Sequence, residues 1–476
     1  MVFNFDNSYL NLPQSLYSLV NPTPVKNPFL LCFNDLLAKD LQIDTHNVKS
    51  LTNLLCGNEI PQNSTPFAQA YAGHQFGYFN RLGDGRAILL GEHVFGNNRV
   101  DIQLKGSGVT PYSRRGDGRA TLSSMLREYL ISEAMYFLNI PTTRSLAVVS
   151  SGELVYREKP QYGGILTRVA QSHIRVGTFE YAGRLADKES LKQLTLYTIQ
   201  RHYPEIDLKG NYALEFLQKV ADKQLDLIVN WLRVGFIHGV MNTDNMSIAG
   251  ETIDYGPCAF MNRYHPKTVF SSIDENGRYA FDNQINMALW NLTRFAEMLL
   301  SLIHEDNQIA IQLATKVLEE FPDKYHQKFN AMMGKKLGIK DVNEEDVLKI
   351  HELLLWMENK EADYTLTFIY LSHPHLVNDV IYQDSFFENW KNWWLKRIGD
   401  FDKAKVLMQQ NNPFIIPRNH IVEQILRDVS QNQSLTEWNK LLQLLQNPYT
   451  APEKFTKEYL QPDKNTDYNH ITYCGT

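Results

Sequence analysis

The chain has 476 residues and a mass of 55.0 kDa, and its 47 Lys and Arg against 53 Asp and Glu residues give a formal net charge of −6. This acidic balance excludes an overall basic surface for nucleic acid, and a hydrophobic fraction of 43% excludes a disordered chain. A single core stops growing at roughly 250–300 residues, so the length predicts two or more lobes.

We expect a cytoplasmic protein without a membrane partner. The first residues lack the basic and apolar regions of a secretory signal and the Arg-rich character of a mitochondrial transit peptide. No run of residues reaches the ~18–20 apolar positions of a membrane span. The four cysteines (Cys32, Cys56, Cys258 and Cys474) are too scattered for a disulfide scaffold and form no CxxC pair, so a zinc–thiolate site is not expected.

The chain begins with an irregular extension and continues into a β-rich segment. Five prolines interrupt residues 1–65, which we interpret as an N-terminal extension with short helices. Residues 86–94 and 99–106 are β-type runs on either side of a Gly-Asn-Asn turn and predict a hairpin.

Two more strand signals and one helix complete the β-rich lobe, which we place at residues 66–185. Residues 144–158 predict a hairpin that turns at Ser151-Gly152, and residues 163–170 predict a further strand. Apolar residues spaced three and four apart predict one strong helix over residues 119–139.

From about residue 188 the apolar pattern is helical. Residues 213–239 predict a long amphipathic helix that ends at Gly235 or Gly239. Further helices are expected over residues 285–305, 308–320, 343–359, 386–397 and 421–446. We assign residues 186–300 to the core of a helical lobe and residues 301–476 to a helical C-terminal extension. The expected fold class is therefore α+β, with two lobes and a ligand site between them.

Three glycine clusters lie close together in the β-rich lobe, at residues 83–86, 106–108 and 116–118. Each alone is typical of an ordinary turn. Glycines also let a backbone approach phosphate oxygens closely, and basic residues are interleaved with these clusters. The three clusters together therefore favour a phosphate-binding site.

Lys105 ends a strand-like run directly before one of these clusters. Protein kinases place a lysine in this way to hold ATP phosphates, and a carboxylate on the following helix fixes it. Glu128 and Glu133 are the candidates. The helical pattern places Glu133 within the apolar stripe and Glu128 facing away from it, so it does not select Glu128.

Two arginines seven residues apart, Arg168 and Arg175, could grip a phosphate together. They could equally form surface ion pairs. The sequence alone leaves both readings open.

Residues 236–258 carry the most informative pattern. Counted against the kinase catalytic loop from His238, Asn245 occupies the metal-binding Asn position, and Asp254-Tyr255-Gly256 corresponds to the kinase D-F-G element. Val240 stands where a kinase has its catalytic Asp, and Asp244 is the carboxylate nearby. Oxygen ligands from an Asn and an Asp suit Mg²⁺ or Mn²⁺. The alternative, a plain turn at residues 242–245, is weakened by the glycine clusters and Lys105.

The chain resembles the selenoprotein O (YdiU) family. The similar stretches are residues 71–87, 103–122, 123–135, 238–261 and 417–420 (PRNH). The resemblance implies a protein-kinase-like bilobal fold, with a β-rich N-lobe and a larger helical C-lobe between N- and C-terminal extensions. It also implies an enzyme that binds ATP in a flipped orientation and moves AMP onto Ser, Thr or Tyr hydroxyls of proteins, with UTP as a related substrate.

The resemblance assigns roles to single residues. Asp244 would accept the proton of the attacking hydroxyl, and Asn245 and Asp254 would be ligands of Mg²⁺ or Mn²⁺. Lys105 would pair with Glu128, the choice that the helical pattern left open. The residues implied to bind the nucleotide are Gly83, Gly85, Arg86, Lys105, Asp117, Gly118, Glu128, Arg168, Arg175 and Asp254.

Members of the family often carry a Cys or selenocysteine near the C-terminus, and Cys474 fits that place. A disulfide between Cys258 and Cys474 is a hypothesis, with reduced thiols as the expected state in a cytoplasm. We expect a monomer that takes protein substrates and no nucleic acid. Two other functions stay open: a kinase that transfers the γ-phosphate, and a nucleotide-binding scaffold without catalysis.

Overall fold

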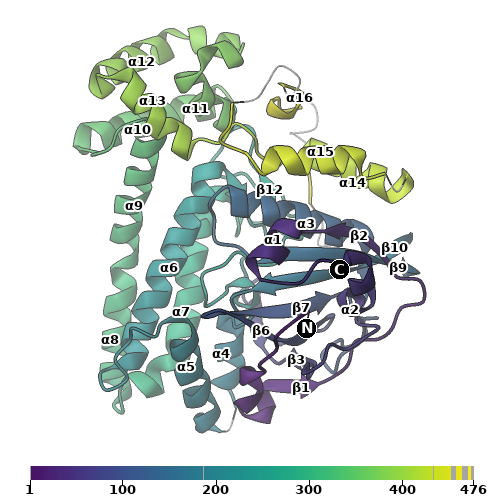
Figure 1. Ribbon diagram of the computed structural model, residues 1–476. Helices are drawn as coiled ribbons and strands as arrows, with labels where there is room; N and C mark the ends of the chain where they lie inside the picture. Colours follow the sequence, from purple (N-terminus) through teal and green to yellow (C-terminus); the bar gives the residue numbers. More distant parts are fainter. Residues whose placement is uncertain (1, 186, 433, 452–456, 464–469, 473–476) are drawn as a thin grey trace.

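The fold is described from a computed structural model that covers residues 2–185, 187–432, 434–451, 457–463 and 470–472. Strands gather in the first 170 residues and helices dominate from residue 176 onward (Figure 1). The fold class is therefore α+β, as predicted. None of the described helices is both long enough and apolar enough to cross a membrane.

One eight-stranded antiparallel sheet organises the first part of the chain. Its order is β1-β3-β6-β7-β10-β9-β2, and β8 pairs with β10. Both edge strands come from the first 65 residues, so the predicted N-terminal extension is built into the sheet. The sheet strands are β1 (Tyr17–Leu19), β2 (Phe29–Phe33), β3 (Phe67–Gln69), β6 (Ala87–Phe95), β7 (Asn98–Lys105), β8 (Ala120–Thr121), β9 (Arg144–Tyr156) and β10 (Pro160–Ala170). Two small ladders join β4 (Ala72–Gln75) to β5 (Tyr78–Arg81), and β11 (Phe236–Ile237) to β12 (Ala259–Phe260).

One predicted hairpin is confirmed and the other is wrong. β6 and β7 pair from Ala87↔Lys105 outward, as expected. The predicted turn at Ser151-Gly152 does not exist, because β9 continues through it and the chain reverses only before β10. Gly152 has a φ of +68° at an irregularity in the β9–β10 register, and a Cβ there would lie 2.4 Å from the carbonyl oxygen of Asn27. The glycine thus serves a bulge in a continuous strand.

The predicted long helix after the sheet is α6, which ends in a left-handed Gly235 with a φ of +74°. Helix α9 was missed, because its Pro322 suggests a break, whereas proline suits the first turn of a helix. The predicted helix 421–446 is two helices, since polar residues interrupt the apolar stripe. The helices are α1 (Asp35–Asp40), α2 (Thr52–Cys56), α3 (Leu122–Phe137), α4 (Val176–Ala182), α5 (Lys188–His202), α6 (Tyr212–Val234), α7 (Gln284–Ile303), α8 (Asn307–Glu319), α9 (Phe321–Lys336), α10 (Glu344–Asn359), α11 (Tyr364–Ser372), α12 (Ser385–Ile398), α13 (Phe401–Asn411), α14 (Asn419–Asn432), α15 (Thr436–Leu445) and α16 (Lys457–Leu460).

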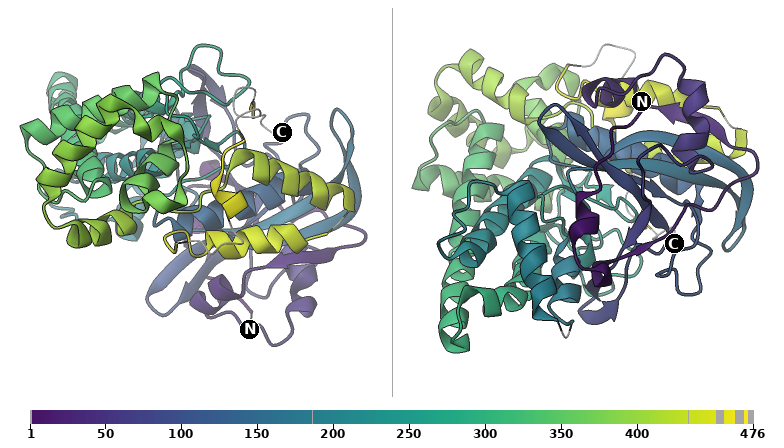
Figure 2. Two further views of the ribbon diagram at one scale, coloured as in Figure 1. Left: turned by 90° about the horizontal axis from the view of Figure 1, so that it is seen from above. Right: turned by 60° about the horizontal axis from the view of Figure 1, so that its bottom comes forward.

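The C-terminal helices return to the sheet. Figure 2 shows α14 and α15, in yellow, lying over the blue part of the molecule, away from the green helices. Arg127 of α3 forms an ion pair of 2.7 Å with Glu423 of α14, and the rings of Tyr129 and Trp438 are 5.2 Å apart. The predicted extension 301–476 therefore contributes to both parts of the fold.

Candidate functional site

Four charged side chains from four segments meet beside the sheet, and we call them the charged cluster: Lys105, Glu128, Arg168 and Asp254. Lys105 Nζ, at the end of β7, lies 2.5 Å from Glu128 Oε2 and 2.8 Å from Asp254 Oδ1. Arg168 of β10 reaches the other oxygen of Glu128 at 3.1 Å. Charge-assisted hydrogen bonds of this kind hold a lysine in one position.

Asp254 is held as an anion. Burial opposes its ionisation, but the charges of Lys105 and Arg86 outweigh it and keep the pKa of this carboxyl well below its usual range. Its backbone has a φ of +66°, a conformation that Asp tolerates better than most residues and that often marks functional sites.

The helix carboxylate that pairs with Lys105 is Glu128, as the resemblance implied. Glu133 instead forms a two-point ion pair with Arg144 of β9, at 2.7 and 2.6 Å. The helical pattern did not select Glu128 because both carboxylates are buried, each against a cation on a different strand.

Two buried polar residues that the sequence interpretation missed orient the arginines. Gln103 accepts hydrogen bonds from Arg168, one of them at 3.2 Å from Nε. Asp84 lies 3.9 Å from Arg175 and accepts from the Gln69 amide at 3.0 Å. The signal for Gln103 was its place two residues before Lys105, because alternate strand residues share a face.

Asp244 sits in the short turn η4 (Thr243–Asn245), beside Gly73 of β4. A Cβ on Gly73 would lie 2.4 Å from Asp244 Oδ1, so only glycine allows this approach. Arg175 donates to the Asp244 carbonyl at 3.0 Å. The carboxylate itself is buried, and Oδ1 has no hydrogen-bond partner within the described residues.

This environment makes Asp244 a weaker acid than an exposed carboxyl. Burial raises the pKa of Asp244 to about 6, although the nearby Arg175 lowers it. A carboxyl with this pKa is ionised at neutral pH and can still accept a proton.

Asn245 and Asp254 offer oxygen ligands at the two ends of one loop. The Asn245 amide nitrogen donates to the Val240 carbonyl at 3.1 Å, so the side-chain oxygen is the atom of this residue that can bind a metal. No group of three or more His, Cys, Asp or Glu side chains that could hold a metal occurs among the described residues. A few protein oxygens completed by phosphate and water match the way Mg²⁺ is bound with nucleotides.

The glycine positions differ in their surroundings. Gly83 and Gly85 pack against Tyr112, and Gly83 has a φ of +131°. Gly118 accepts from the Gly108 amide at 3.0 Å, within the loop that follows β7. Asp117 is exposed and forms a two-point ion pair with Arg157, at 2.9 and 3.1 Å. The role of Asp117 in nucleotide binding, which the family resemblance implied, stays a prediction.

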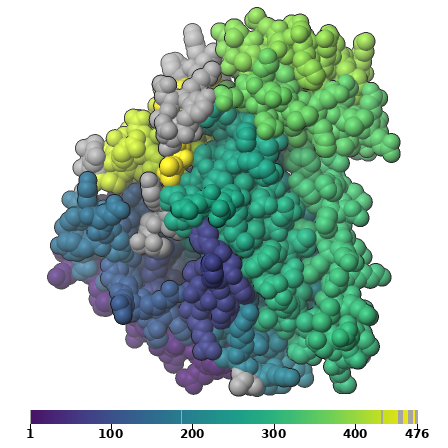
Figure 3. All heavy atoms as spheres, turned by 180° about the vertical axis from the view of Figure 1, so that it is seen from behind, coloured from purple at the N-terminus to yellow at the C-terminus, as the bar shows by residue number. Residues whose placement is uncertain are grey.

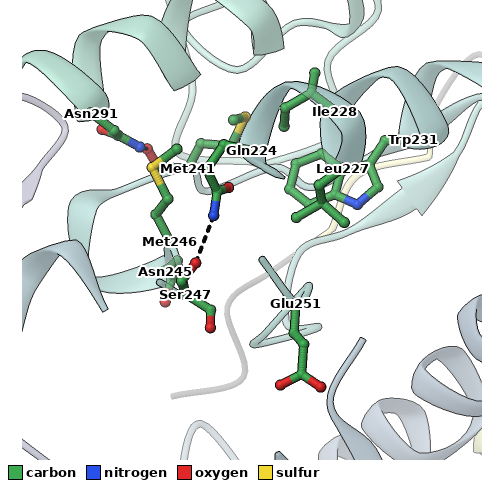
Figure 4. A pocket seen from close by; sticks show the side chains of 10 residues that line it. All are labelled: Gln224, Leu227, Ile228, Trp231, Met241, Asn245, Met246, Ser247, Glu251 and Asn291. Carbon is green, nitrogen blue, oxygen red and sulfur yellow. Dashed lines mark hydrogen bonds between the residues drawn. The ribbon is translucent and has the colours of Figure 1, made fainter. Parts of the chain in front are cut away.

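Helices α6 and α7 brace the loop that carries Asp244 and Asn245 (Figure 4). Gln224 donates to the Ser247 carbonyl at 2.6 Å, drawn as the dashed line, and Asn291 donates to the Met241 carbonyl at 3.0 Å. The cavity lined by these residues measures about 10 Å³, whereas small-molecule sites need roughly 300 Å³ or more. The cavity is therefore too small to hold a nucleotide, and the residues that line it support the loop.

The structure describes only one of the two cysteines of the hypothetical disulfide. Cys258 is a buried free thiol, and burial raises its pKa to about 12. Cys474 lies outside the described residues.

Known proteins resemble the chain over its whole length. The sequence model described as "Protein adenylyltransferase SelO" matches residues 1–446. A relative named "Protein nucleotidyltransferase YdiU" from Pelagibacter ubique is 51% identical over 481 residues, covering 100% of this chain and 99% of the relative. Proteins with the same name from Nitrosococcus oceani and Bacillus cereus are each 50% identical, covering 100% of this chain and 97% and 98% of their own lengths. The chain belongs to the SelO family of protein adenylyltransferases.

Proposed function

We propose that this chain moves AMP from ATP onto Ser, Thr or Tyr hydroxyls of proteins and releases pyrophosphate, with UTP as a second nucleotide substrate. Family membership supports nucleotidyl transfer to protein. The observation that carries the proposal is the pairing of Lys105 with both Glu128 and Asp254, beside a buried Asp244 that is a weaker acid than usual.

The fold supports the kinase-like part of the proposal. A lysine on a strand, a glutamate on the next helix and an Asp in an Asp-Tyr-Gly segment correspond to the parts with which kinases hold ATP. We assign residues 66–185 to the N-lobe, residues 186–300 to the core of the larger helical C-lobe, and residues 1–65 and 301–476 to N- and C-terminal extensions that pack onto these lobes.

The chemistry follows from which phosphates the cations bind. Lys105, Arg168 and Arg175 would hold the β- and γ-phosphates, which leaves the α-phosphorus facing the acceptor. The acceptor oxygen bonds to this phosphorus as the bond to pyrophosphate breaks, and Asp244 takes the hydroxyl proton. The cations stabilise the charge on the departing pyrophosphate.

Asn245 and Asp254 would hold Mg²⁺ or Mn²⁺, which would neutralise phosphate charge. Val240 is buried and cannot accept a proton, so transfer by the kinase route lacks its usual base. This favours AMP transfer over γ-phosphate transfer.

Intact-mass measurement after incubation with each nucleotide and each metal tests the proposal, because AMP, UMP and phosphate add different masses to an acceptor protein. Parallel reactions with ATP labelled in the α- or the γ-phosphate identify the transferred group. Label from the γ-position alone would establish a kinase. Nucleotide binding without any labelled acceptor would establish a scaffold.

A further inference from the structure

The β4–β5 hairpin packs directly against the turn that carries Asp244. Figure 3 shows the hairpin in blue-purple, wedged beside the teal helical part. A Cβ on Gly73 would meet Asp244 Oδ1 at 2.4 Å, and one on Gly177 of α4 would meet the Ala72 carbonyl oxygen at 2.0 Å. Helix α4 and the hairpin therefore meet at backbone distance, and the Asp244 carboxylate lies directly against the backbone of Gly73.

Glu180 of α4 joins the hairpin to the turn. Its carboxylate is 0% exposed, and its two oxygens bond separately to His74 Nδ1 and to the Thr243 hydroxyl. The Thr243 hydroxyl in turn accepts from the His74 amide at 2.8 Å. Both Glu180 oxygens, His74 Nδ1 and the Thr243 hydroxyl thus have partners, as buried polar groups require. We call Glu180, His74 and Thr243 the hairpin latch.

The latch residues flank Asp244 in two ways, along the chain and across the contact with the hairpin. Thr243 immediately precedes Asp244, and His74 immediately follows Gly73, against which the Asp244 carboxylate lies. Helix α4 contributes at both ends, because Arg175 at its start donates to the Asp244 carbonyl at 3.0 Å. Asp244 Oδ1 makes no hydrogen bond within the described part of the chain, and the carboxylate hydrogen-bonds the side chain of Gln75 in the same hairpin, so its position is set by the hairpin and the turn that the latch holds together.

We propose that Glu180, His74 and Thr243 are positioning residues for nucleotidyl transfer, which hold the Asp244 carboxylate within reach of the acceptor hydroxyl. This rests on the proposed role of Asp244 as proton acceptor. A base must lie within hydrogen-bond distance of the proton it takes, and a displacement of about 1 Å costs roughly 100-fold in rate. The bonds of the latch reach none of the residues proposed to hold phosphate or metal, so the latch should affect turnover and not nucleotide affinity.

The test uses Thr243→Val, which keeps the side-chain shape and removes the hydroxyl, with Thr243→Ser as the variant that restores the hydroxyl. Thr198→Val is a matched control, because Thr198 is also 0% exposed and bonds only to a helix carbonyl, that of Leu194, at 2.7 Å. We expect Thr243→Val to lose about 100-fold in kcat with its nucleotide Kd unchanged, and Thr243→Ser to recover most of the rate.

Hydrogen–deuterium exchange on the full-length variants gives a readout that needs no activity. Thr243→Val should exchange faster in peptides covering residues 72–76 and 242–246 and nowhere else. Unchanged exchange there, a kcat close to wild type, or an equal loss in Thr198→Val would each overturn the proposal. If the wild-type protein transfers no nucleotide, the proposed function fails, and the exchange measurement alone still decides whether the latch holds the turn.

Discussion

Two aspartates ten residues apart in one loop, Asp244 buried and Asp254 half-buried, have pKa values shifted in opposite directions. Cations from the sheet hold the pKa of Asp254 well below its usual range, against the effect of burial. Burial raises the pKa of Asp244 to about 6. Carboxyls whose environments push their pKa values apart take different roles, one as a permanent charge and one as a proton carrier.

The difference comes from which part of the fold surrounds each residue. Asp254 contacts Lys105 of β7, which pairs with Glu128, and Glu128 pairs in turn with Arg168. Asp244 lies against the backbone of Gly73, and its nearest cation, Arg175, bonds to its carbonyl and not to its carboxylate. The sheet therefore sets the acidity of Asp254, and α4 with the β4–β5 hairpin sets that of Asp244.

The largest effect is expected from breaking the charged cluster. Lys105→Ala removes a cation that both Asp254 and the phosphates would use, so the transfer rate should fall by about 1000-fold or more. Glu128 keeps Arg168 as a partner at 3.1 Å, so the fold should persist. Transfer kinetics together with circular dichroism measure both, and the exposed Lys267→Ala serves as the control. A rate within tenfold of wild type would remove Lys105 from the mechanism.

The second test separates Asp244 from the charged cluster. Asp244→Asn should keep nucleotide binding and lose about 100-fold or more in transfer, because an amide cannot accept the proton. A raised carboxyl pKa means that ionisation costs stability in the folded state, so near pH 7 the neutral variant should also melt at a higher temperature. Calorimetric titration and thermal melts check both. A loss of nucleotide affinity would instead assign Asp244 to metal or phosphate binding.

The pH dependence of the transfer rate tests the difference between Asp244 and Asp254 without any mutation. Below about pH 6 Asp244 is protonated and cannot act as a base, so kcat/KM should fall about tenfold per pH unit. Asp254 stays ionised through this range, so nucleotide affinity should not follow the same curve. Rates and nucleotide Kd measured from about pH 5 to about pH 8 give the answer, and a flat rate profile would contradict the role of Asp244.

The sequence predicted the parts of the site that short motifs carry. The turn with Asp244 and Asn245, the Asp254 segment and Lys105 follow from spacing alone. The partners that orient these residues could not be predicted from spacing. Gln103 and Asp84 are isolated polar residues in the sequence, and they contact Arg168 and Arg175 only when β7, β10 and α4 pack together. The same holds for Glu180, which reaches the turn only through the close approach of Gly73 and Gly177.

The fold was predictable where local pattern and tertiary structure agree, as for α3, α6 and the β6–β7 hairpin. The fold was not predictable where one residue type suits two different local structures. Gly152 signals a turn in sequence and forms a bulge in β9, and Pro322 signals a break but lies in the first turn of α9. The sheet edges supplied by β1 and β2 depend on contacts distant in sequence, which no local pattern reports.

The smallest effect is expected at Asp117, which is implied to bind the nucleotide but is exposed, unlike Asp244 and Asp254. It is paired with Arg157, which holds the pKa of Asp117 below its usual range, but the Asp117 carboxylate is exposed to solvent and Arg157 is only half-buried. Exposed ion pairs contribute about 0–1 kcal/mol, so Asp117→Asn should change the free energy of unfolding by no more than that. Nucleotide affinity should change by a few-fold at most, because Arg157 and not the cluster cations is its partner. Urea unfolding and calorimetric titration measure the two quantities. A tenfold or larger loss of affinity would show that this loop closes over the terminal phosphates when the nucleotide binds, and would add a third region to the site.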